Sequence, residues 1–111
     1  MAESSASVTS SERSVEPLAG LDDVVEAFLA MRTPDELKRF IRDLCTLSEL
    51  EALAHRWQTA RLVDEGVAYH EIAHRVPTST ATVTRVAQWL RHGAGGYRLA
   101  LERTRPKGQS T

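Results

Sequence analysis

The chain has 111 residues, of which 41% are hydrophobic and 26% are charged, as in a single small globular domain. No apolar run approaches the roughly 18 residues of a membrane-spanning helix, and the N-terminal residues contain no apolar stretch of the kind found in secretory signals. We therefore expect a cytoplasmic protein without a membrane partner. The single cysteine, Cys45, excludes an intrachain disulfide and any cysteine-rich zinc site.

The net charge of −1 hides an uneven distribution. Residues 1–52 contain five Lys or Arg and eleven Asp or Glu, whereas residues 53–111 contain nine Lys or Arg and four Asp or Glu. A basic second half indicates a surface that faces a polyanion such as nucleic acid. A solvated surface with no partner is the alternative.

Polar segments flank the central part of the chain. Residues 1–17 contain six serines and almost no large apolar side chain, so we expect this tail to be disordered. Residues 18–103 should form the folded domain. Residues 104–111 should form a flexible tail, whose Arg105 and Lys107 could reach phosphate.

The spacing of apolar residues predicts an all-α domain of six helices. The first helix should cover residues 21–31. The second should begin at Pro34, because Thr33 can act as its N-cap and Glu36 completes a capping box. A second capping box begins at Ser48 and opens the longest helix, which should end at Gly66.

Three shorter helices follow in the basic half. The fourth should cover residues 69–75, because Pro77 disfavours helical geometry in the residue before it. The fifth should cover residues 79–91, and the sixth residues 97–103 after a cluster of glycines. The glycines follow a helix rather than a strand, so they indicate a helix cap and hinge and not a phosphate-binding loop.

The fourth helix contains the zinc-peptidase pattern H-E-x-x-H, formed by His70, Glu71 and His74. A zinc peptidase also needs a longer site helix, a third ligand and a substrate cleft. Pro77 ends this helix soon after His74, and the other two histidines lie on other helices without ligand-like spacing. We therefore interpret the pattern as surface histidines on a short helix and expect neither a metal site nor an enzyme.

Residues 69–90, YHEIAHRVPTSTATVTRVAQWL, fit a helix-turn-helix better. Ile72 should face inward on the support helix, and Val83 and Val86 on the recognition helix. The recognition helix would then lie in the major groove of DNA, where Arg can bind guanine and Gln adenine through paired hydrogen bonds. Its outward residues, the candidate DNA contacts, are Ser79, Thr80, Ala81, Thr84, Arg85 and Gln88. From the support helix, His70 and Arg75 would contact phosphate; for every one of these residues the alternative is a solvated side chain.

From about Leu21 to Arg103, some 80 residues, the chain resembles the Trp repressor superfamily, and more closely its small YerC/YecD-type branch. The segments that carry the resemblance are LSELEALAHRWQTARLVDEG, STATVTR and GAGGYRLALER. The resemblance implies an intertwined, all-helical homodimer. In such a dimer the first three helices and the last form a shared core, and each subunit presents one helix-turn-helix to half of an operator. The implied activity is transcriptional regulation, usually repression.

Two residues depart from the family pattern. Pro77 stands where the turn usually has Gly, and it forbids the positive φ that Gly permits. The turn must therefore differ or shift its register. Tyr69 stands where a capping Ser or Thr is expected, so the support helix should begin without a good cap.

The resemblance also bears on a small-molecule effector. Arg56 and Arg85 match the two arginines that flank the indole in tryptophan-sensing members, and Thr46 matches a third pocket residue. However, Val86 replaces a Gly and Trp89 replaces a Ser, so we expect these side chains to fill the space of the ligand. Tryptophan should then not act as corepressor, and no cofactor is expected. A pocket of different shape for another small molecule is the alternative.

We therefore predict a homodimeric, sequence-specific regulator that binds double-stranded DNA. The alternative is a protein-interaction module that keeps the fold but does not bind an operator.

Overall fold

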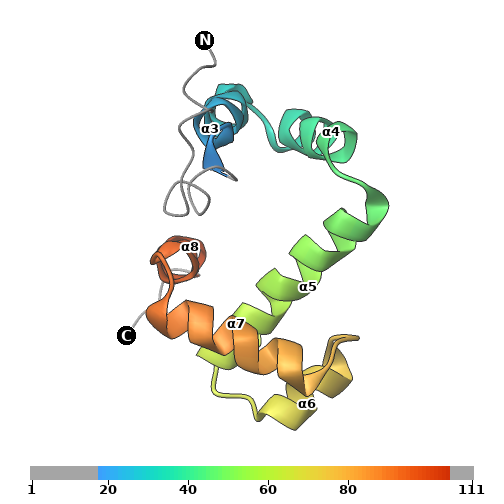
Figure 1. Cartoon of the computed structure of the whole chain (residues 1–111), viewed down its shortest axis with the longest axis vertical. Helices are drawn as coiled ribbons and strands as arrows, with labels where there is room; N and C mark the ends of the chain where they lie inside the picture. Colours follow the sequence, from blue (N-terminus) through green and yellow to red (C-terminus); the bar gives the residue numbers. More distant parts are fainter. Residues whose placement is uncertain (1–17, 106–111) are drawn as a thin grey trace, which may run out of the picture. The chain divides into compact units, whose positions relative to one another are not determined.

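The computed structural model describes residues 18–105, which form six α-helices and no β-strand (Figure 1). The all-α fold class predicted from the sequence is confirmed. The expectations for residues 1–17 and for Lys107 lie outside the described residues. Within the described range, no helix is long and apolar enough to cross a membrane.

The chain divides into two compact units, and the boundary along the sequence falls between Cys45 and Thr46. The first unit contains α3 (Leu21–Ala30) and α4 (Pro34–Leu44). The predicted cap of α4 is present, because the hydroxyl of Thr33 accepts a hydrogen bond from the backbone N–H of Glu36 at 3.1 Å. The rings of Phe28 and Phe40 meet edge to face, with centroids 5.7 Å apart. Neither helix contains a buried residue, so the two helices described here enclose no interior within one chain.

The second unit begins with the longest helix, α5 (Leu47–Asp64). The prediction that Ser48 opens this helix was wrong, because Thr46 is the N-cap. The Thr46 hydroxyl accepts from the Glu49 N–H at 3.1 Å, and the Glu49 carboxylate accepts from the Thr46 N–H at 2.8 Å. Thr46 and Ser48 both match the capping-box pattern. With Thr46 as the cap, α5 begins directly after α4 ends.

Gly66 ends α5, as the sequence indicated. Its φ is +86°, in the left-handed region that suits glycine. The N–H of Gly66 donates to the carbonyl of Val63 at 3.0 Å, and the N–H of Val67 donates to the carbonyl of Leu62 at 3.1 Å. This pair of bonds is a Schellman motif, which turns the chain sharply into the next helix.

The core of the second unit lies where α6 (Tyr69–Arg75) and α7 (Thr80–His92) pack together beside α5 (Figure 1). The inward orientation predicted for Ile72, Val83 and Val86 is confirmed, since all three side chains are completely buried. Val76, at the end of α6, forms one core cluster with Ile72 and Val83. The long helix contributes Thr59 and Ala60, which are also completely buried.

The turn between α6 and α7 contains no left-handed residue. Within residues 18–105, positive φ occurs only at Gly66 and Gly95, so the Val76–Pro77 turn closes with ordinary backbone geometry. Ser79 is the N-cap of α7 and accepts from the N–H of Thr82 at 3.1 Å. By contrast, α6 has Ala68 at its N-cap and no side-chain cap, as the position of Tyr69 indicated.

The last helix, α8 (Gly96–Thr104), extends past the predicted end of the domain. Two residues assigned to the flexible tail belong to the fold, because Thr104 is helical and its hydroxyl donates to the carbonyl of Ala100 at 2.8 Å. Arg105 is only partly exposed and forms an ion pair with Asp64 at 2.8 Å. The salt bridge fixes the end of α8 to the end of α5. It also engages the Arg105 guanidinium, which the sequence analysis considered as a contact to phosphate.

Candidate nucleic-acid interface

One side of α7 is exposed and the other is buried. Its buried residues are Val83, Val86, Ala87 and Leu90. All six positions predicted to face DNA are exposed, namely Ser79, Thr80, Ala81, Thr84, Arg85 and Gln88. The polar side of α7 is therefore open along its length and rests on an apolar base, as a helix that enters the major groove requires.

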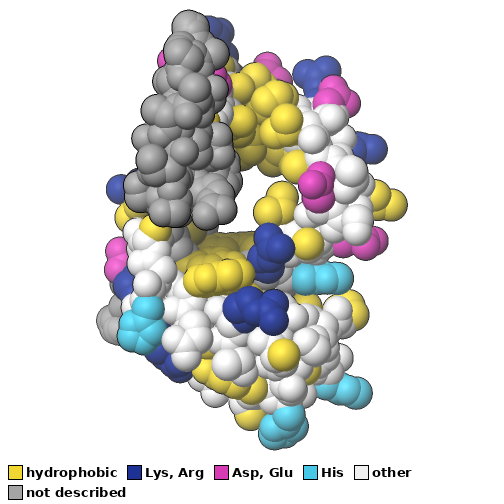
Figure 2. Space-filling view, viewed as in Figure 1, with side chains coloured by type: hydrophobic (Ala, Val, Ile, Leu, Met, Phe, Trp, Pro, Cys, Tyr) yellow, Lys and Arg dark blue, Asp and Glu magenta, His cyan; other side chains and the backbone are white. Residues whose placement is uncertain are grey.

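The two candidate phosphate contacts on α6 are also exposed, and Figure 2 shows histidine side chains projecting from the surface around this helix. Arg75, however, is already engaged by a neighbour. Its Nη2 and Nε donate to the carboxylate of Glu71 at 2.7 Å and 3.2 Å. This pairing lowers the pKa of Glu71, so the carboxylate is charged at neutral pH and remains available to Arg75.

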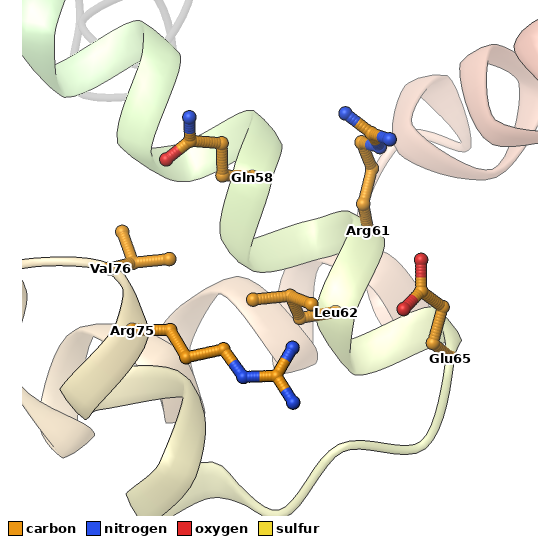
Figure 3. Close-up of a pocket in the computed structure, with 6 residues that line it drawn as sticks. All are labelled: Gln58, Arg61, Leu62, Glu65, Arg75 and Val76. Atoms are coloured by element: carbon orange, nitrogen blue, oxygen red, sulfur yellow. The ribbon is translucent and has the colours of Figure 1, made fainter.

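Arg75 also borders a cavity of about 310 Å³ between α5 and α6 (Figure 3). Its side chain reaches from the end of α6 toward Leu62 of α5 in this view. The cavity is lined by Gln58, Arg61, Leu62, Glu65, Arg75 and Val76. Arg75 is therefore not grouped with the exposed side chains of α7, and its Nε and Nη2 already donate to Glu71.

The three residues of the H-E-x-x-H pattern, His70, Glu71 and His74, lie exposed on α6. Glu71, which would be the general base, is hydrogen-bonded to Arg75 instead. Across the part of the chain that the structure describes, no group of three or more His, Cys, Asp or Glu side chains is placed to hold a metal ion.

A second cavity, the arginine cavity, lies between α5 and the N-terminal half of α7. Its volume is about 260 Å³, and its lining includes both Arg56 and Arg85. Its full lining is Ala52, His55, Arg56, Thr78, Thr82, Arg85, Val86 and Trp89. Sequence reasoning missed three of these polar residues, His55, Thr78 and Thr82, although His55 precedes Arg56 and Thr82 lies one helical turn before Val86.

Two expectations about this cavity are not met within one chain. Val86 and Trp89 line the cavity but do not fill it. Thr46 is not part of the lining, because its hydroxyl caps α5. Arg56 follows Thr46 by ten positions along α5, which is roughly 15 Å along the helix axis.

A third cavity, the aromatic groove, lies between α5, the C-terminal half of α7 and α8. Its volume is about 400 Å³. Its lining is Trp57, Trp89, Gly93, Ala94, Gly96, Tyr97 and Ala100. The rings of Trp57 and Tyr97 stack with centroids 6.5 Å apart, and burial raises the pKa of the Tyr97 phenol. Trp89 is 46% exposed, so the groove presents aromatic surface to solvent within one chain.

The two short helices are also joined outside the core. Arg91 of α7 donates a hydrogen bond to the hydroxyl of Tyr69 at the start of α6, at 3.1 Å. This bond supports the uncapped end of α6. Two packed helices joined by a tight turn, with one helix exposing short polar residues, an arginine and a glutamine, define a helix-turn-helix protein.

Comparison with known proteins agrees with this class. Residues 19–105 match the family model of the Trp repressor protein. The uncharacterized protein YerC of Bacillus subtilis (strain 168) is 39% identical over 85 residues, which are 77% of this chain and 82% of that protein. The chain belongs to the Trp repressor family, whose members are regulators rather than enzymes.

Two solved structures share the fold. A crystal structure of a Trp repressor candidate from Staphylococcus aureus has a TM-score of 0.73 and 35% identity, and the match covers 80% of this chain and 91% of that one. A TrpR-like protein from Eubacterium eligens has a TM-score of 0.74 and 32% identity, over 79% of this chain and 93% of its own.

Proposed function

We propose that this protein is a homodimeric, sequence-specific DNA-binding transcription regulator that acts as a repressor. In this proposal α7 lies in the major groove and α6 supports it. The observation that carries the proposal is the exposure of all six polar or small positions on one side of α7, over a buried apolar side. An operator lies on the chromosome, so we expect the protein to act in the cytoplasm.

The homodimer is proposed from the apolar surface that one chain leaves uncovered. No residue of α3 or α4 is buried, and Leu29 and Leu47 are 79% and 72% exposed. In the second unit, Trp89 of the aromatic groove is also 46% exposed. We propose that a second copy of the chain covers these side chains, which gives two recognition helices related by a two-fold axis. Such helices read half-sites about 34–36 Å apart.

Selection from a random pool of duplex DNA tests the proposal. We expect enrichment of a two-fold symmetric sequence, with an affinity that falls steeply as salt rises because Lys and Arg displace counterions from phosphate. Sedimentation at micromolar concentration should show a dimer. A monomer would exclude the two-headed arrangement.

The same selection distinguishes sequence-specific DNA binding from the other candidate function. A dimer that enriches no sequence and binds duplex DNA without salt dependence would be a protein-interaction module that keeps the fold.

A further inference from the structure

Trp89 lies between two cavities of opposite character. On one side it lines the aromatic groove with Trp57 and Tyr97, and on the other it lines the arginine cavity with Arg56 and Arg85. No other residue is shared by these two linings. The indole of Trp89 is therefore the common wall of an apolar surface and a cationic one.

Trp89 is 46% exposed and its side chain borders both cavities, so the ring has room to move. Its backbone is rigid by contrast, because Val86 and Leu90 on either side of it are buried. The carbonyl of Trp89 also lies against Gly93, where the Cβ of any larger residue would approach it to 2.5 Å. Whatever fills one cavity therefore decides how far the ring can enter the other.

Arg85 lies one helical turn before Trp89, so the two side chains are neighbours on the same side of α7. A ring that enters the arginine cavity takes space from the Arg85 side chain, which must then extend toward solvent, where DNA would lie. A ring that leaves the cavity allows Arg85 to fold back beside Arg56.

We propose that Trp89 couples dimer formation to DNA binding. When a second copy fills the aromatic groove, the indole is held against the arginine cavity, and Arg85 is kept in its DNA-contacting position. The protein's own side chain then has the role that a bound effector would otherwise have. This inference rests on the proposed function, and it makes Trp89 a positioning residue that acts through Arg85.

The test compares two matched substitutions, Trp89→Phe and Trp57→Phe. Each replaces one of the two indoles of the chain by a smaller ring in the same groove, but only Trp89 borders the arginine cavity. Both variants should fold and dimerise, as judged by circular dichroism and sedimentation. We expect W89F to bind the selected operator on the order of tenfold more weakly than the wild type, and W57F to bind it nearly as well.

A double-mutant cycle separates positioning from general damage. If Trp89 acts through Arg85, then Arg85→Ala should weaken operator binding far less in the W89F background than in the wild type. Independent effects would overturn the inference, and so would wild-type affinity in W89F or an equal loss in W57F. Should W89F not fold, Trp89→Tyr serves in its place. A wild-type dimer that binds no operator would overturn the proposed function itself, and this inference with it.

Discussion

Arg85 lies on the exposed side of α7 and also lines the arginine cavity. We expect Arg85→Ala to lower the affinity for the selected operator by about 1–3 kcal/mol, because one paired contact with a base is lost. Binding to unrelated duplex should change little, and the helical content should stay the same. Competition binding with operator and random duplex measures both effects.

The matched control is Arg98→Ala, which removes the same charge from an exposed position on α8. An equal loss of operator affinity in both variants would mean that Arg85 contributes only its charge.

Glu71 holds Arg75 through two hydrogen bonds on the surface of α6. We expect the Glu71→Gln variant to bind duplex DNA about two- to fivefold more tightly than the wild type. The substitution removes a negative charge and leaves Arg75 free to contact phosphate. The dependence on salt should also become steeper. Glu65→Gln is the control, since Glu65 borders the same cavity as Arg75 and the substitution removes the same charge. Equal gains in the two variants would contradict a specific role for the Glu71–Arg75 pair.

Thr59 is completely buried, and its hydroxyl has no hydrogen-bond partner within the described chain. We expect Thr59→Val to raise the free energy of unfolding by about 1 kcal/mol, because it replaces an unsatisfied hydroxyl by a methyl group of similar size. Thr59→Ser keeps the hydroxyl and removes the methyl, so it should lower stability. Thermal unfolding compares the three proteins. A less stable T59V protein would show that the hydroxyl has a partner in the assembled molecule.

The Schellman motif at Gly66 ends α5. We expect Gly66→Ala to destabilise the protein by about 1 kcal/mol, because alanine is strained at a φ of +86°. A Cβ at this position would meet no atom within 4 Å, so the cost arises from the backbone alone. Gly20→Ala is the control, because Gly20 has an ordinary φ of −99° and equally open surroundings. Similar denaturant midpoints for G66A and the wild type would contradict the argument.

The helices could be predicted from the sequence because the signals that form them are local. Apolar spacing and caps such as Thr33 and Ser79 act within a few residues, and so does the stop signal at Gly66. The choice between Thr46 and Ser48 as the cap of α5 could not be made in this way, because both match the same local pattern. It depends on where α4 ends.

The candidate site was predicted less completely, for a physical reason. Which side of α7 is exposed follows from helical periodicity, so the open positions were found. That Arg75 binds Glu71, and that Thr59 is buried without a partner, depends on rotamers and packing between helices. No spacing rule contains that information. The arginine cavity needs residues from both α5 and α7, and the space left between them could not be judged from side-chain volumes alone.

We expect that free tryptophan is not a corepressor of this protein. Val86 and Trp89 narrow the arginine cavity, and a second copy in the aromatic groove would hold the indole of Trp89 against it. Calorimetry with L-tryptophan at millimolar concentration should show no binding, and operator affinity should be the same with and without it. Micromolar affinity, or operator binding that requires tryptophan, would show that the cavity remains open in the dimer.

The absence of any buried residue in α3 and α4 has a consequence for the living cell. If a second copy supplies the missing interior, α3 and α4 of each newly made chain stay accessible to proteases until the chain meets its partner. The concentration of folded dimer then rises more steeply than the rate of synthesis. At low concentration most chains are degraded before they dimerise, whereas at high concentration dimerisation protects them. Control of the target promoter would therefore have a threshold in gene dosage, set by assembly rather than by the operator.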